Sequence, residues 1–225
     1  SETALRGAAE RRAGPVIDRL IAEAPGLSTG PARGRARRAL LRYAMDAARL
    51  PIDRVAERAA AAGYDLDALV ARDGWPADVA CRRLAALEPG AGVPRFGYVA
   101  ANAAGALFDL REVPGFHPIR HGTICPLWVL CRAQQAPERA MRQLAAMPTG
   151  HRFVFVARAA PLGAPEFGRP RHFRTDMLVL SEADAALTVY APRAPGELEA
   201  EEVGTSCRVC PRKGCGHRVE DPLAA

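Results

Sequence analysis

Apolar residues recur at helical spacing through the first ninety residues. Within residues 8–24, for example, Val16, Leu20 and Ile21 fall on one face of a helix. The same spacing, with proline and glycine as start and stop signals, predicts further helices over residues 35–49, 51–62, 65–70 and 77–87. None of these helices is long enough to be stable alone, so residues 1–90 are predicted to pack as a helical bundle.

The pattern changes to that of strands after the Pro89-Gly90-Ala91-Gly92 turn. Residues 96–110 predict a β-hairpin, and the apolar run from Arg152 to Arg158 predicts a strand. Further predictions are strands over 173–180 and 186–190, helices over 126–135 and 137–147, a loop over 160–171, and a short helix or turn over 181–185. Together these elements predict an α+β fold: a helical domain (1–90), a sensor-like α+β domain (91–203) and a cysteine-rich tail (204–225).

Length and composition are those of a globular protein. The chain has 225 residues, of which 49% are hydrophobic and 25% charged, enough for a substantial apolar core. No apolar run approaches the ~18 residues that a membrane span requires, and the first residues lack the basic-then-apolar pattern of a secretory signal. Since reduced cysteines are also implied below, we expect a cytoplasmic protein with no membrane partner. Whether it forms a homo-oligomer stays open.

Positive charge makes nucleic acid one candidate partner. The net charge is +6, and five arginines lie within residues 33–42. The two helices between Leu66 and Leu87 have the proportions of a helix-turn-helix, in which Arg82 and Arg83 would contact DNA phosphates. The alternative is an ordinary packed helical hairpin with a solvated basic face, because two arginines are a small phosphate footprint. DNA or a DNA-binding protein is therefore a candidate partner only.

Patterns typical of enzymes are missing from the sequence. It has no paired carboxylates, nucleophile elbow or glycine-rich phosphate loop. A His-Glu-x-x-His zinc site needs two histidines on one helix, yet the first histidine of the chain is His117. We therefore expect a protein that is not an enzyme.

The densest chemistry lies in the tail. Three of the six cysteines follow the spacing Cys207-x2-Cys210-x4-Cys215, which lets thiolates converge on a metal ion or one face of a cluster. Between Cys207 and Arg218 there are four basic residues and no acidic one, so the local charge favours thiolates and offsets an anionic centre. N–H groups of the glycine-rich turn are candidate donors to the sulfurs. A four-thiolate iron-sulfur cluster is favoured, zinc is the alternative, and structural or disulfide cysteines are the remaining interpretation.

A fourth ligand must come from elsewhere in the chain. Cys125 precedes Pro126, which is suited to open a helix, and a helix N-terminus would stabilise a thiolate there. Cys131 would then face the other side of that helix and is expected in the core, although it stays the alternative fourth ligand. Cys81 lies in an apolar helix and is expected to be a packing residue. His217 is a candidate zinc ligand, although a solvated terminal histidine is commoner.

These motifs resemble a known family. Cys125-Pro126-Leu127-Trp128, followed far downstream by Gly204-Thr205-Ser206-Cys207-Arg208-Val209-Cys210-Pro211-Arg212, Cys215 and Arg218, is similar to the C-terminal domain of the short-chain fatty acyl-CoA regulators. Residues 50–87 and 187–191 agree with it, so the resemblance covers roughly residues 36–222.

The resemblance implies a cytoplasmic sensor domain that binds a [4Fe-4S] cluster and a short-chain acyl-CoA and acts in transcription regulation. Carried over to this sequence, the cluster ligands would be Cys125, Cys207, Cys210 and Cys215. No short motif marks the acyl-CoA site. Arginines and a histidine suited to CoA phosphates are Arg120, His121, Arg169, Arg171 and Arg174.

The sequence also departs from the family. Members usually begin with a complete DNA-binding domain and a region resembling a zinc peptidase, and this chain shows neither pattern. Ser181 stands where a further family cysteine is expected, which makes Cys125 the more necessary fourth ligand.

Overall fold

The structure is a computed structural model that describes residues 2–119, 122–164, 166–194 and 196–223. The chain forms two compact units, residues 1–55 and 56–225. This division differs from the boundaries near residues 90 and 203 that the sequence predicted. Among the described residues, no helix combines the length and apolarity needed to cross a membrane.

The first unit is built on a pair of helices, α1 (Glu2–Glu23) and α2 (Gly30–Arg49). Ile17 and Ile21 of α1 pack against Leu41 of α2 in a small buried cluster. The Thr29 side chain caps α2 by accepting a hydrogen bond from the Ala32 N–H at 3.3 Å. Arg37 of α2 forms ion pairs with two carboxylates of α1, so apolar packing and charge hold the pair together.

Helix α3 (Ile52–Ala61) spans the division between the units, and α4 (Leu66–Asp73) and α5 (Ala77–Leu84) follow in the second. Asp65 caps α4 by accepting from the N–H groups of Asp67 and Ala68. Gly74, in the left-handed conformation, ends α4. The helices predicted for residues 1–90 are therefore all present, although α5 ends three residues earlier than residue 87.

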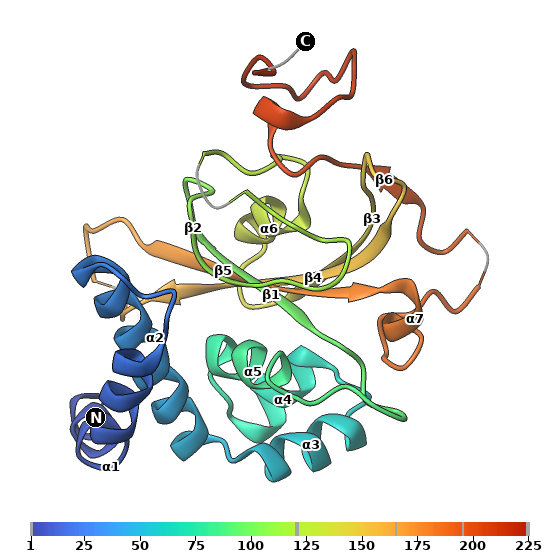
Figure 1. The fold of residues 1–225 in the computed structure, drawn as a ribbon. Helices are drawn as coiled ribbons and strands as arrows, with labels where there is room; N and C mark the ends of the chain where they lie inside the picture. The colour runs from blue at the N-terminus through green and yellow to red at the C-terminus, as the bar shows by residue number, and fades with distance from the viewer. Residues whose placement is uncertain (1, 120–121, 165, 195, 224–225) are drawn as a thin grey trace. The chain divides into compact units, whose positions relative to one another are not determined.

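The second unit is organised around one six-stranded sheet with the order β2-β1-β5-β4-β3-β6 (Figure 1). Its strands are β1 (Gly97–Asn102), β2 (Leu107–Arg111), β3 (Ala140–Ala146), β4 (Arg152–Leu162), β5 (His172–Ser181) and β6 (Ala200–Glu202). All neighbours are antiparallel except β3 and β6, which are parallel. This sheet and the preceding helices confirm the α+β class.

Both faces of the sheet are covered, which explains why its central strands have nearly continuous apolar sequences. One face carries the main core, in which Phe153, Phe155 and Val179 pack with Phe116 and Trp128. Helix α6 (Val129–Arg132), the 3-10 turn η1 (Ala133–Gln135) and the C-terminal tail lie on this side, and α4 and α5 lie on the other (Figure 1). The core therefore separates the tail from the helices.

Three predicted elements are wrong. Residues 137–147 form β3 rather than a helix, because pairing with β4 over seven residues outweighs their alanine-rich helix preference, and Glu138 has a positive φ of 66°. Residues 186–190 form turns after α7 (Glu182–Ala185) instead of a strand; there Val189 donates to the Gly63 carbonyl at 3.0 Å.

The third error concerns the predicted helix over 126–135, which is reduced to α6 and η1. Trp128 is extended and α6 has only four residues. Cys125 therefore does not stand at a helix N-terminus, and its thiol must be stabilised by other groups.

Candidate metal centre

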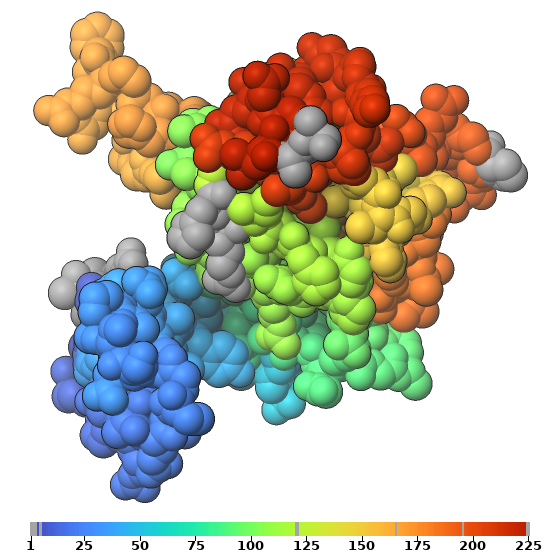
Figure 2. Space-filling model, turned by 45° about the horizontal axis from the view of Figure 1, so that its top comes forward, coloured from blue at the N-terminus to red at the C-terminus, as the bar shows by residue number. Residues whose placement is uncertain are grey.

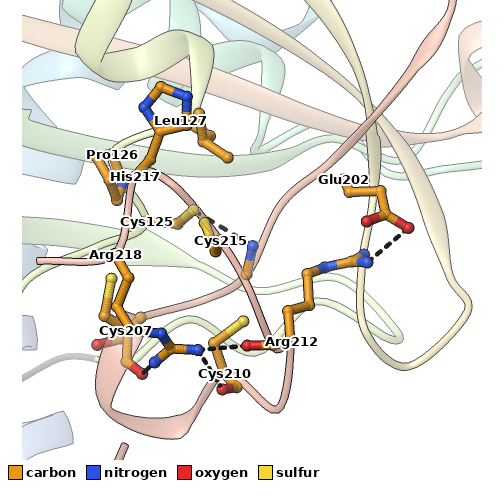
Figure 3. A pocket seen from close by; sticks show the side chains of 12 residues that line it. Cys125, Pro126, Leu127, Glu202, Cys207, Cys210, Arg212, Cys215, His217 and Arg218 are labelled. Atoms are coloured by element: carbon orange, nitrogen blue, oxygen red, sulfur yellow. Dashed lines mark hydrogen bonds and ion pairs between the residues drawn. The ribbon is translucent and has the colours of Figure 1, made fainter. Parts of the chain in front are cut away.

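One pocket gathers the four predicted cysteine ligands. Its volume is about 330 Å³, including the part open to solvent, and its wall contains Cys125, Cys207, Cys210 and Cys215 (Figure 3). The lining is completed by Pro126, Leu127, Glu202, Gly204, Ser206, Arg212, His217 and Arg218. The fold thus brings Cys125, which precedes α6, to the three cysteines of the tail.

Two hydrogen bonds to backbone carbonyls of the tail hold it against the Cys125 segment. The Cys125 N–H donates to the Thr205 carbonyl at 3.1 Å. Three residues on, the Trp128 indole N–H donates to the Gly204 carbonyl at 2.7 Å, and its ring is fully buried among Phe116 and Phe155. Because a buried indole N–H needs an acceptor, this bond fixes where the chain enters the tail.

Gly204 lies directly between two of the sulfur atoms. Its N–H donates to the Cys125 Sγ at 3.3 Å. A Cβ at this position would lie 2.9 Å from the Cys210 Sγ, closer than side chains approach one another. A larger residue at this position would therefore force the Cys210 side chain to shift.

Two arginines anchor the tail to the sheet and to itself. Arg212 donates to the Ala146 carbonyl at the end of β3 at 2.8 Å and pairs with Glu202 of β6 at 2.8 Å. Arg208, in the short 3-10 turn η2 (Cys207–Val209), pairs with Glu220 at 2.9 Å. The tail accordingly lies as a continuous mass over the neighbouring part of the unit (Figure 2).

The other two cysteines lie apart from the pocket wall. Cys81 is fully buried, and burial raises its pKa well above the ordinary thiol value, as expected for the predicted packing residue. Cys131 packs against the main core with its Sγ 4.0 Å from the Cys125 carbonyl oxygen. Burial raises the pKa of Cys131 to about 11, which keeps that thiol protonated. The placement favours Cys125 over Cys131 as the fourth ligand.

The electrostatics of Cys125 are mixed. Burial raises the pKa of its thiol, and the Gly204 N–H acts in the opposite direction. Nearby Cys207 and Cys210 raise it further, because neighbouring thiolates repel one another. A cation or cluster among these sulfurs would relieve that repulsion.

The donor set is that of a thiolate-bound metal centre. All six cysteines are free thiols, and four of them surround one pocket. Within the described parts of the chain, no three His, Cys, Asp or Glu side chains converge closely enough to hold one metal ion. Four thiolates are the ligand set of a [4Fe-4S] cluster, which takes one thiolate at each iron, and also of a structural zinc site.

The predicted phosphate-binding residues do not form one site. Arg120 and His121 lie outside the described residues. Arg169 and Arg171 lie in the exposed loop between β4 and β5, which projects from the unit in Figure 2; Arg169 pairs with Glu166. Arg174 is instead engaged in a buried network with Asp176, Tyr98 and Asp78. Of the three predicted arginines that the structure describes, the two in the loop are exposed to solvent.

The predicted DNA-contacting arginines are turned inward. Arg83 is only 2% exposed. Arg82 is largely buried and pairs with Asp78 on the same helix at 3.0 Å. Ser181, which stands at an expected family cysteine, caps α7 by accepting from the Asp184 N–H at 3.0 Å. Because Arg83 is buried and Arg82 largely so, α5 lacks the phosphate-contacting arginines that the sequence suggested.

The sequence did not reveal which residues hold the thiols in place. Trp128 and Arg218 belonged to the motif that resembles the family, but the sequence did not show what either side chain contacts. Two sequence features could have served as a signal: Trp128 follows Cys125 by three residues, and Gly204 precedes Cys207 by three residues. Both residues constrain the backbone near a cysteine. Their mutual contact needed the fold.

Comparison with known proteins gives consistent results. A family model described as "Short-chain fatty acyl coenzyme A regulator, C-terminal" matches residues 88–225. The "Propionyl-CoA carboxylase regulator" of Cereibacter sphaeroides is 34% identical over 197 residues, which is 87% of this chain and 42% of that protein. The "HTH-type transcriptional regulator PrpR" of Mycobacterium tuberculosis is 34% identical over 209 residues, 91% of this chain and 42% of that one.

More distant matches agree. The "HTH-type transcriptional regulator RamB" of M. tuberculosis is 28% identical over 212 residues, 92% of this chain and 44% of that protein. A solved structure titled "Mycobacterium tuberculosis transcriptional regulator" superposes with a TM-score of 0.84 at 28% identity, covering 98% of this chain and 67% of that one. The chain therefore spans less than half the length of the curated relatives it matches.

Proposed function

This chain belongs to the short-chain fatty acyl coenzyme A regulator family, and we propose that it is a sensor unit that binds a [4Fe-4S] cluster and a short-chain acyl-CoA. The named relatives are regulators, two of them transcriptional regulators of the HTH type, and not enzymes. A role in transcription regulation follows from that kinship. A cytoplasmic location suits the proposal, because thiols stay reduced there.

The observation that carries the cluster assignment is the pocket in which four free thiols meet. Cys125, Cys207, Cys210 and Cys215 would be its ligands. When bound, such a cluster supplies an iron–thiolate centre that is sensitive to oxidants. The Gly204 N–H, aimed at the Cys125 sulfur, would stabilise negative charge on it.

The tail offers a route from the site to a signal. It is held on the sheet by a small number of hydrogen bonds, chiefly those of Trp128, Cys125 and Arg212. With thiolate ligation removed, these contacts, the Arg212–Glu202 ion pair and the Thr123–Glu220 hydrogen bond would remain to hold residues 204–223. A segment held by so few contacts can change from ordered to disordered. Release of the tail would alter the surface that it covers.

Metal and sulfide analysis tests the cluster. Protein purified without oxygen should contain about four iron and four sulfide per chain and absorb broadly in the visible range. Serine variants of Cys125, Cys207, Cys210 and Cys215 should lose that absorbance, whereas Cys81→Ser and Cys131→Ser, matched controls outside the pocket wall, should keep it. Zinc without sulfide would refute the cluster. Loss in Cys131→Ser with retention in Cys125→Ser would move the fourth ligand to Cys131.

The acyl-CoA part of the proposal is supported by the family and by the relative named for a propionyl-CoA enzyme. Arg169 and Arg171 are the exposed candidates for its phosphates. Titration with acetyl-CoA and propionyl-CoA should show saturable binding, weakened about tenfold in Arg171→Gln. Arg152→Gln, an exposed arginine at the other end of β4, is the control. Absence of binding to the intact protein would remove this part of the proposal.

A further inference from the structure

Arg218 makes an unusual set of contacts beside the thiols. Its Nη1 donates to the carbonyls of Cys207 at 2.9 Å and Glu220 at 3.4 Å. Its Nη2 donates to the carbonyls of Cys210 at 3.2 Å and Arg212 at 2.5 Å. One planar guanidinium thus ties together four points of the tail backbone, two of them at cysteines of the pocket (Figure 3).

Arg218 differs from the neighbouring tail arginines Arg208 and Arg212 in the groups that surround its charge. Arg208 pairs with Glu220 and Arg212 with Glu202. In the described ranges, Arg218 contacts only neutral carbonyls and forms no ion pair with a carboxylate. It also lines the pocket that contains the four thiols. The positive charge of Arg218 therefore lies beside the thiols of the pocket without a carboxylate ion-pair partner among the described residues.

We infer that Arg218 is a positioning and charge-compensating residue of the metal centre. Its fork fixes the carbonyls of Cys207 and Cys210, and so the spacing of those two thiols, while its positive charge offsets the negative charge of the ligated site. Lysine would keep the charge but could not bridge four carbonyls, and glutamine would lose the charge and most donors. The charge-compensating role of Arg218 rests on the proposed cluster. Its positioning role rests only on its hydrogen bonds within the tail.

The electrostatic part is tested in the anaerobic, cluster-containing protein with Arg218→Lys and Arg218→Gln. Lys213→Gln is the matched control, since it removes one positive charge from the same loop at an exposed side chain outside the pocket wall. We expect the midpoint potential to fall in Arg218→Gln and to stay near that of the unchanged protein in Arg218→Lys and Lys213→Gln. Bleaching by a chelator should be about tenfold faster in both Arg218 variants. A potential in Arg218→Gln equal to that of the control would overturn this part.

The positioning part is tested in metal-free protein by amide hydrogen exchange. Exchange across residues 204–223 should be faster in both Arg218 variants than in the unchanged protein and Lys213→Gln, with the strands unaffected. If all four proteins exchange alike, Arg218 does not position the tail. If the unchanged protein takes up no cluster, the proposed function fails, while this exchange measurement still decides whether Arg218 organises the cysteine loop.

Discussion

Gly204 shows how a residue without a side chain can define a metal site. Its backbone occupies the space between the Cys125 and Cys210 sulfurs and donates a hydrogen bond to the first. The Trp128 indole holds its carbonyl from the other side. Gly204 thus supplies the N–H donor to Cys125, the carbonyl acceptor for Trp128 and the room that the Cys210 sulfur occupies. A larger residue would displace this backbone.

Gly204→Ala is expected to weaken the centre. The added methyl would lie 2.9 Å from the Cys210 Sγ, so that the cysteine must move, and cluster loss to a chelator should be about tenfold faster. Overpacking should also lower the free energy of unfolding by about 1–3 kcal/mol. Visible absorbance decay and urea titration measure the two effects.

Gly216→Ala is the control for that change. Gly216 is also a glycine of the tail and directly follows Cys215. A Cβ added to it would meet nothing within 4 Å, and the φ of Gly216 is not positive. Its variant should behave as the unchanged protein. Equal cluster lifetimes for the two alanine variants would contradict the steric role of Gly204.

The three tail cysteines in the pocket wall could be predicted from sequence, because thiol spacing and local charge are properties of the chain itself. Cys125 was predicted from an expected helix start and from the family resemblance. The reason given for Cys125 was wrong: no helix starts there, and the Gly204 N–H is the group that contacts its sulfur. The clamp of Arg218 was out of reach, because nothing in a linear sequence tells which carbonyls an arginine will contact.

At the scale of elements, a buried ionic network joins α5 to β1 and β5. Asp176, fully buried, accepts from the Tyr98 hydroxyl at 2.5 Å and from Arg174 at 2.6 Å. Arg174 continues to Asp78 of α5 at 3.5 Å, and Asp78 pairs with Arg82. Burial opposes ionisation of Asp78, but these two arginines bring its pKa below the usual value. The network fixes α5 on the sheet face opposite the tail.

Asp176→Asn should destabilise the second unit strongly. The change leaves Arg174 as a buried charge without its main partner, at a cost of about 3–5 kcal/mol in the free energy of unfolding. Glu166→Gln, which breaks the exposed pair with Arg169, should cost less than about 1 kcal/mol. Chemical denaturation compares the two. A loss for Asp176→Asn no larger than that for Glu166→Gln would show that the network contributes little to stability.

Which elements could be predicted also has a physical explanation. The helices and the central strands β4 and β5 follow from local periodicity and apolar runs. Strand β3 does not: Met141 to Ala146 carries strong helix formers, and only pairing with β4 on one side and β6 on the other makes it a strand. Predictions made from local propensity fail where long-range pairing decides the conformation.

At the scale of the molecule, the sheet of the second unit is stabilised by its own core, whereas the tail is ordered by its contacts with the rest of the unit. The main core is built from residues between Val99 and Val203 and covers one face of β4 and β5, and the residues on their other face are buried as well. The tail adds hydrogen bonds and thiols, and ligation would close a loop of about eighty residues between Cys125 and Cys207. Much of the order of the tail is therefore expected to come from ligation.

Removal of the cluster should therefore loosen the tail and leave the sheet intact. In amide hydrogen exchange, the metal-free protein should lose protection over residues 204–223 and at the Cys125 N–H, which donates to Thr205. The amides of β4 and β5 should stay protected, because these strands pair with each other over ten residues and Cys207, Cys210 and Cys215 are not part of their core cluster. Cys207→Ser, purified without added iron, should give the same map as the metal-free protein. Loss of protection spreading through β4 and β5 would show instead that the centre is needed for the whole unit to fold, and a sensor acting through tail release would then be ruled out.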